Sequence, residues 1–155
     1  MILRLRVPTA AVVFFLLLSV SLLATWSSAA PVADPLGTWV TESGSATVRI
    51  ANCGPELCGT IVALKEPNDP ATGRPKTDKN NPDSGKRSRP LLGVQIVFGM
   101  KPSGTASKWS GQVYNAEDGK TYSGNITLQN SGTLKLEGCV LGGLFCKTQT
   151  WTRGG

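Results

Sequence analysis

The sequence contains no histidine among its 155 residues, and this absence excludes several classes of function. Ser-His-Asp and Cys-His catalytic arrangements are impossible, and the commonest general base and metal ligand are missing. The Ser-x-x-Lys and Gly-x-Ser-x-Gly motifs of other hydrolases are absent as well. Asp78, Glu117 and Asp118 could in principle serve carboxylate chemistry, but each lies in a predicted turn, where polar residues are common. We therefore expect a protein that is not an enzyme and has no catalytic residues, metal site or cofactor.

Long apolar runs are also scarce, and the one clear example lies near the first residue. Residues 12–23 are apolar apart from two serines, Arg4 and Arg6 precede them, and small residues follow at positions 27–30. This order is typical of a cleaved export signal. The run is short for a membrane-spanning helix, which needs about 20 residues. We therefore expect a signal peptide at 1–30, a periplasmic or secreted product, and membrane contact only through this signal.

Charged residues are few, and their balance is mildly basic. The chain has ten acidic and sixteen basic residues; two of the basic ones, Arg4 and Arg6, lie in the signal, which leaves fourteen and a net charge of +4. The remaining chain of about 125 residues has the size of one domain. A charge of this size fits weak attraction to anionic surfaces without demanding such a partner.

Only four cysteines are present, and all lie beyond the signal. An even number in an exported chain predicts two disulfides, and four cysteines allow three pairings. We favour the local pairs, Cys53 with Cys58 and Cys139 with Cys146, because short loops close easily. A zinc site is the alternative reading of these cysteines, and neither spacing is the Cys-x-x-Cys of common zinc ligands.

Helical periodicity is missing throughout, and strands of period two take its place. Alternating or strand-like runs occupy eight segments, at residues 38–42, 46–50, 60–64, 92–98, 109–114, 122–128, 134–137 and 146–152. Turn sequences at 115–119, 130–132 and 142–143 separate the last four runs and predict consecutive hairpins. Eight antiparallel strands joined in this way can close into an up-and-down barrel without free edges. The sequence therefore predicts an all-β fold, a small eight-stranded antiparallel β-barrel.

One segment, residues 65–90, breaks this rhythm. It is polar and holds seven basic and four acidic residues. Loops of this length in compact domains are often functional or disordered. No aromatic side chain is interleaved with the basic ones, so we expect no nucleic-acid partner. The segment is either a solvated excursion or a lid over one mouth of the barrel.

Several short strings together resemble DUF2147, a family of exported bacterial proteins. They are Asp-Pro-Leu-Gly-Thr-Trp at 34–39, Cys-Gly at 53–54 with Leu-Cys-Gly-Thr-Ile at 57–61, Asp78 with Asn-Asn-Pro at 80–82, Arg-Pro-Leu-Leu-Gly at 89–93, Trp109 with Gly111, Tyr-Asn at 114–115 with residues 117–122, Gly138 to Cys146, and Thr-Trp-Thr-Arg at 150–153. The resemblance covers 34–153 and implies a lipocalin-like, calycin-type barrel domain with a long polar loop at 65–90. It implies no catalytic or binding residues. It does imply that Trp39 and Arg153 meet at the barrel floor.

A small barrel is either filled by its own side chains or holds one small ligand. We expect a non-enzymatic binding protein with a small apolar or amphipathic ligand in the barrel. The side chains that would line such a site, and that plain core packing also explains, are Val48, Val62, Val94, Ile96, Trp109, Tyr122 and Ile126. The alternative is an envelope protein–protein interaction or stress-accessory module that acts through residues 65–90, with Arg87 and Arg89 as contacts.

Overall fold

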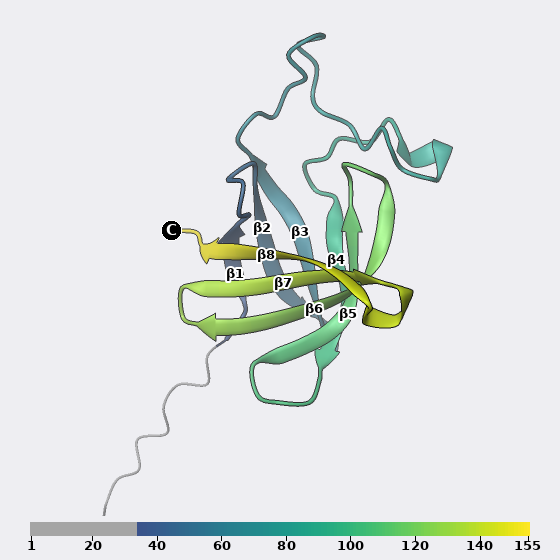
Figure 1. Cartoon of the computed structure of the whole chain (residues 1–155). Coiled ribbons are helices and arrows are strands. Elements are labelled where there is room, and N and C mark those ends of the chain that lie inside the picture. Colours follow the sequence, from purple (N-terminus) through teal and green to yellow (C-terminus); the bar gives the residue numbers. More distant parts are fainter. Residues whose placement is uncertain (1–33) are drawn as a thin grey trace, which may run out of the picture. The chain divides into compact units, whose positions relative to one another are not determined.

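A computed structural model describes residues 34–155, so the signal peptide predicted at 1–30 lies outside the described part of the chain. This part consists of strands joined by turns, one long loop and two short 3-10 helices (Figure 1). The strands are β1 (Gly37–Val40), β2 (Ala46–Cys53), β3 (Glu56–Leu64), β4 (Gln95–Pro102), β5 (Lys108–Asn115), β6 (Lys120–Asn130), β7 (Thr133–Val140) and β8 (Phe145–Arg153), and the 3-10 helices are η1 (Ser84–Lys86) and η2 (Leu141–Gly143). No helix within 34–155 is long and apolar enough to cross a membrane.

The strands form one closed barrel in which each is antiparallel to its neighbour in sequence and β8 returns to β1. The predicted eight-stranded up-and-down barrel is therefore confirmed. Because consecutive strands run in opposite directions, the connections between them lie alternately at the two ends of the barrel. We call the end with residues 41–45, 65–94, 116–119 and 141–144 the mouth end. The floor end carries the turns at 54–55, 103–107 and 131–132, the start of β1 and the end of β8.

Two strands begin three or more residues away from their predicted starts, whereas the other starts agree within two residues. The strand expected at 92–98 begins only at Gln95, because Leu92 is 53% exposed and Gly93 adopts a left-handed backbone conformation with φ of 90°. The strand expected at 60–64 begins earlier, at Glu56, because residues 54–55 alone form the turn that follows Cys53. Both differences arise where a turn is shorter or later than its residues suggest.

Both disulfides join cysteines of one hairpin. Cys53 bonds to Cys58 across the β2–β3 hairpin, and Cys139 bonds to Cys146, its direct register partner across β7 and β8. The structure thus contains the two local pairs. One closes a hairpin at the floor end and the other closes a hairpin at the mouth end, so neither bond links distant strands.

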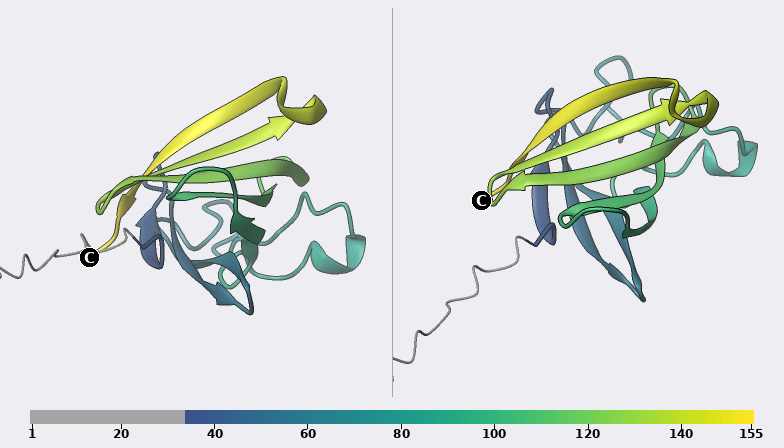
Figure 2. Two further views of the ribbon diagram at one scale, coloured as in Figure 1. Left: turned by 90° about the horizontal axis from the view of Figure 1, so that it is seen from below. Right: turned by 60° about the horizontal axis from the view of Figure 1, so that its bottom comes forward.

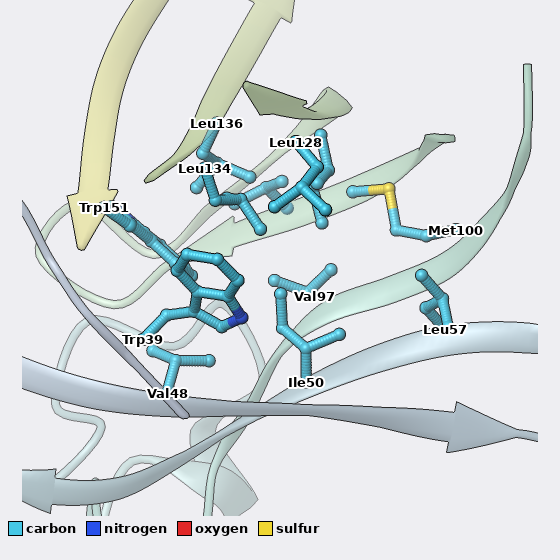
Figure 3. Packing of buried hydrophobic residues seen from close by; sticks show 12 residues of the cluster. Trp39, Val48, Ile50, Leu57, Val97, Met100, Leu128, Leu134, Leu136 and Trp151 are labelled. Carbon is cyan, nitrogen blue, oxygen red and sulfur yellow. The ribbon is translucent and has the colours of Figure 1, made fainter. Parts of the chain in front are cut away.

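Apolar side chains fill the barrel from floor to mouth. The floor cluster contains the residues Trp39, Val48, Ile50, Leu57, Val97, Met100, Val113, Ile126, Leu128, Leu134, Leu136 and Trp151 (Figure 3). A smaller mouth cluster of Ile61, Val94 and Tyr114 lies where β3 ends and β4 begins. Gly124 permits this dense packing, since a Cβ there would lie 2.4 Å from a methyl carbon of Val113.

Arg153 covers the floor of the barrel. Its guanidinium carbon lies 4.3 Å from the centroid of the Trp39 ring, and its nitrogens donate to the backbone oxygens of Asp34, Leu36 and Ser131. The Trp39 indole N–H donates to the Pro35 carbonyl at 2.8 Å. A planar cation with five donors can stack on the indole and bind three carbonyls at once. One side chain therefore joins β1, β8 and the β6–β7 turn.

Replacing Arg153 with Met is expected to lower the free energy of unfolding by about 2–3 kcal/mol, because the cation–π contact and the charged hydrogen bonds are both lost. Urea denaturation followed by tryptophan fluorescence measures this change. Arg49→Met is the control, since Arg49 is exposed on β2. Equal stability losses in the two variants would contradict the role given to Arg153.

Candidate functional site

Five of the seven side chains expected to line a ligand site are packed against other apolar groups. Val48 and Ile126 are completely buried in the floor cluster, and Trp109 is half-buried against it. Val94 belongs to the mouth cluster, and Ile96 packs against both clusters. Neighbouring side chains therefore fill the space around these five residues, as in a close-packed core.

The other two expected lining residues lie elsewhere. Val62 is 36% exposed, whereas its neighbour Ile61 is buried in the mouth cluster. The prediction that Val62 faces the interior is wrong, because a run that is apolar on both faces does not reveal which face points inward. Tyr122 is half-buried, and its hydroxyl donates to Asp118 of the β5–β6 turn. It therefore belongs to the rim of the mouth rather than to the interior.

The long loop between β3 and β4, residues 65–94, is folded onto the mouth end, and we call it the mouth loop. Two antiparallel bridges, Asn68 with Pro75 and Thr77 with Pro90, turn it into hairpin-like segments. Backbone hydrogen bonds from Lys76 to Pro67 and from Leu91 to Lys76 hold these segments together. The loop is thus neither structureless nor wholly solvated, although its sequence has no periodicity.

A buried carboxylate anchors this loop to the barrel. Asp78 has no exposed surface, and its oxygens accept hydrogen bonds from Tyr114 on β5 at 2.6 Å and from Asn81 at 2.7 Å. Arg89 donates to the same carboxylate through Nη2 at 2.7 Å and through Nε at 3.0 Å. A buried charge is stable only when it is paired and hydrogen bonded, and Asp78 meets both conditions. The carboxylate therefore fixes the loop to β5.

The same contacts perturb the acidity of the groups involved. Burial by itself would raise the pKa of Asp78, but the hydrogen bonds from Tyr114, Asn81 and Arg89, together with the Arg89 charge, hold it below its usual value. Burial raises the pKa of Tyr114 to about 12, assisted by the hydrogen bond to Asp78 and its negative charge. At neutral pH the site thus contains a carboxylate and a protonated phenol.

A second anchor joins the loop to the β5–β6 turn. The Asn80 side chain donates to the backbone oxygens of Ala116 at 3.3 Å and Glu117 at 2.7 Å. Gly119 of this turn lies directly against the loop backbone, because a Cβ there would fall 1.8 Å from the Asn80 carbonyl oxygen. The two segments are therefore in close contact through a position where only glycine fits.

The two arginines expected to act as loop contacts are used within the loop. Arg87 donates through Nε to the Asn81 carbonyl at 2.8 Å and through Nη2 to the Pro82 carbonyl. Arg89 pairs with Asp78. These bonds stabilise the loop itself, in which Lys76 and Lys86 also form ion pairs with Glu66 and Asp83.

An open cleft of about 520 Å³ lies between the mouth loop and the β5–β6 turn. It is lined by Asp69, Thr72, Arg74, Pro75, Lys76, Thr77, Lys79, Asn80, Leu91, Ala116 and Glu117. Both sides of the cleft are fixed in place, since Asp78 and Asn80 tie one wall to the other. Among the ion pairs within 34–155, Lys76 pairs with Glu66, and none involves Arg74 or Lys79.

The sequence suggests Asp78 only as a possible catalytic carboxylate and Arg89 only as a possible partner contact, and it does not indicate that the two form a loop anchor. Asp78, Asn80 and Asn81 also belong to a string that resembles the family. Nothing in their spacing indicates that Tyr114, which lies 36 residues further on, would be the partner of Asp78. Within the described residues, no three His, Cys, Asp or Glu side chains come together as a metal site.

Asp78→Asn is expected to lower the free energy of unfolding at pH 7 by about 1–2 kcal/mol, because the charge-assisted hydrogen bonds to the carboxylate are lost, while the Arg89 side chain, which is 39% exposed, can be rehydrated. The pKa of Asp78 is lower in the folded state than its ordinary value of 3.8. Its contribution to stability is therefore fully present above pH 3.8 and is lost as the pH falls through the folded-state pKa. The stability difference between wild type and variant should therefore shrink below pH 3.8. Urea titrations at several pH values measure it, and a difference that does not change with pH would contradict the ion pair.

Gly119→Ala is expected to release the mouth loop, because the added methyl group would overlap the Asn80 carbonyl. Trypsin cleavage after Lys79 should then accelerate by about tenfold or more, as the loop opens more often. Gly44→Ala is a matched control, since Gly44 has a similar φ of 67° but no atom within 4 Å of the new methyl group. Similar cleavage rates in the two variants would show that backbone strain alone explains the effect.

Comparison with known proteins agrees with this architecture. A search of curated proteins finds no significant match. Among solved structures, a similar fold occurs in a protein described as "Protein HP1028 from the human pathogen Helicobacter pylori belongs to the lipocalin family". The TM-score is 0.67 at 22% sequence identity, over 79% of this chain and 84% of that one. The likeness shows a lipocalin-like fold.

The family model described as "Uncharacterized protein conserved in bacteria (DUF2147)" matches residues 37–153, from the first residue of β1 to the last residue of β8. This span includes the whole barrel, both disulfides and the mouth loop with its Asp78 anchor. The chain therefore belongs to the DUF2147 family.

Proposed function

We propose that this protein is an exported, non-enzymatic binding protein whose ligand lies in the cleft at the mouth end rather than inside the barrel. The observation that carries the proposal is the 520 Å³ cleft between two segments that buried and backbone hydrogen bonds hold together. Its size suits a small molecule. The two disulfides support export, because such bonds persist in oxidising compartments such as the periplasm and the extracellular space.

The lining of the cleft favours an amphipathic anion. Arg74 and Lys79 are exposed and contribute two cations without carboxylate partners in the described part of the chain, while Pro75, Leu91 and Ala116 contribute apolar surface. Two carboxylates, Asp69 and Glu117, also line the cleft, and one oxygen of Asp69 accepts from the Ala71 backbone N–H at 2.8 Å. An anionic head group with a short apolar tail would use both kinds of surface.

The interior of the barrel is a less suitable place for a ligand, because side chains already fill it. Twelve buried apolar residues form the floor cluster, and the mouth cluster continues it toward the loop. A ligand inside the barrel would have to displace these side chains from close packing, at a cost of several kcal/mol. The mouth cleft requires no such displacement, which supports it as the site of the amphipathic ligand predicted from the sequence.

Decyl phosphate, as a probe, should bind to the protein with a measurable heat in isothermal titration calorimetry below its micelle concentration. Neutralising two cations in the variant Arg74→Gln/Lys79→Gln removes about 1 kcal/mol per charge contact at an exposed site, so the affinity should fall by roughly thirtyfold. Decyl maltoside, which has no charge, should bind more weakly than decyl phosphate.

The control variant is Lys101→Gln/Lys108→Gln, which makes the same change in net charge at the floor end. It should bind decyl phosphate as the wild type does. An equal loss of affinity in both double variants would show that net charge alone explains the effect. If neither decyl phosphate nor decyl maltoside binds, the cleft is not a site for an amphipathic anion.

A further inference from the structure

Strand β8 has a neighbour along its whole length on one side and along only its last residues on the other. Toward β7 the register runs over eight pairs, from Thr133 with Thr152 to Val140 with Phe145. Toward β1 it consists of two pairs, Trp39 with Arg153 and Val40 with Thr152. Within 34–155, no strand therefore covers the second side of residues 145–151. Figure 2 shows the β7–β8 hairpin extending past β1 toward η2.

The backbone groups that this edge presents can be assigned from the bonds at its end. Gly154 N–H donates to Thr38 on the β1 side, and Arg153 N–H donates to Gly132 on the β7 side. Consecutive residues of a strand direct their N–H and C=O groups to opposite sides. The groups of Thr152 thus point to β1, and those of Cys146, Thr148 and Thr150 point the same way, beyond the reach of β1.

This edge lacks the features that usually prevent strand addition. Such edges are protected by proline, bulges, several charges or very short length. Residues 145–151 contain no proline and a single charged side chain, Lys147, and the β7–β8 register has no shift. Residues 145–148 are exposed. The adjoining tip adds apolar surface, since Leu141 is 71%, Leu144 78% and Phe145 65% exposed.

We propose that β8 is a dimerisation edge, on which β8 of a second copy of this chain adds antiparallel about a two-fold axis at Thr148. This axis sets Cys146 opposite Thr150. The backbone N–H and C=O groups that point to the free edge in one copy then face those of the other copy. The same axis sets Lys147 opposite Gln149, so the one cation of residues 145–151 does not face itself. An axis at Lys147 would oppose two cations, which destabilises a strand pair.

A second copy fits this edge better than an unrelated extended peptide because the edge complements itself. A two-fold interface requires one patch to match its own image. Each outer pair contains Thr150 of one copy and Cys146 of the other, and Thr148 lies at the axis. The exposed Phe145 of each copy lies opposite the buried Trp151 of the other, beside the seam where β1 ends at Val40. The two sheets then continue as β7–β8–β8–β7, and the apolar tips are covered.

Sedimentation velocity of the exported protein, with both disulfides intact, tests this proposal. The wild type should show a monomer–dimer equilibrium, and Thr148→Lys should weaken dimerisation by at least about tenfold, because it opposes two new cations at the axis. Thr105→Lys, in the exposed β4–β5 turn, adds the same charge at the floor end and should leave the equilibrium unchanged.

Hydrogen exchange of the wild type supplies a readout that needs no variant. The amides of Cys146, Thr148 and Thr150 should become protected as the protein concentration rises, while those of Lys147 and Gln149, which pair with β7, should not change. A protein that remains monomeric up to about 1 mM overturns the proposal. So does a dimer that Thr148→Lys leaves intact, because it would use another surface.

Discussion

The closure of the barrel depends on Arg153, because strands β1 and β8 share only two register pairs. Two pairs supply few ladder hydrogen bonds, and the guanidinium adds three bonds to backbone carbonyls as well as a contact with the Trp39 ring. Trp39 in turn packs in the centre of the floor cluster (Figure 3). The core and the seam are thus joined through one cation–aromatic contact, between the exposed Arg153 and the buried Trp39.

The mouth end follows a different principle, in which polar groups replace apolar packing. Val94 is the one buried apolar side chain of the mouth loop, and a carboxylate with four hydrogen bonds holds the loop to β5. Such a network is sensitive to geometry, because each missing partner leaves a buried charge or polar group unsatisfied. This explains why a loop rich in proline and charge keeps a defined path, and why the cleft beside it has fixed walls.

Much of the fold is predictable from the sequence, and the reasons for the failures are physical. Alternation of period two identifies the strands, and glycine-containing turns such as 115–119 identify the hairpins. The phase of β3 is not predictable, because Ile61 and Val62 are both apolar and only tertiary packing selects one of them. The Asp78 anchor is also not predictable from the sequence, since its partner Tyr114 lies on β5, far along the chain, and the residues around Asp78 resemble an ordinary polar turn.

The placement of the disulfides has a consequence for the order in which the chain can acquire its bonds. The cysteines of each pair are five and seven residues apart, whereas Arg153 contacts a carbonyl 117 residues earlier in the sequence. A chain that emerges from its N-terminal side can form the first sulfur bridge while most strands are still missing. The barrel itself cannot close until β8 has arrived. Every intermediate before that moment therefore exposes β1 and its tryptophan to other chains, and rapid delivery of the last strand protects the protein from aggregation.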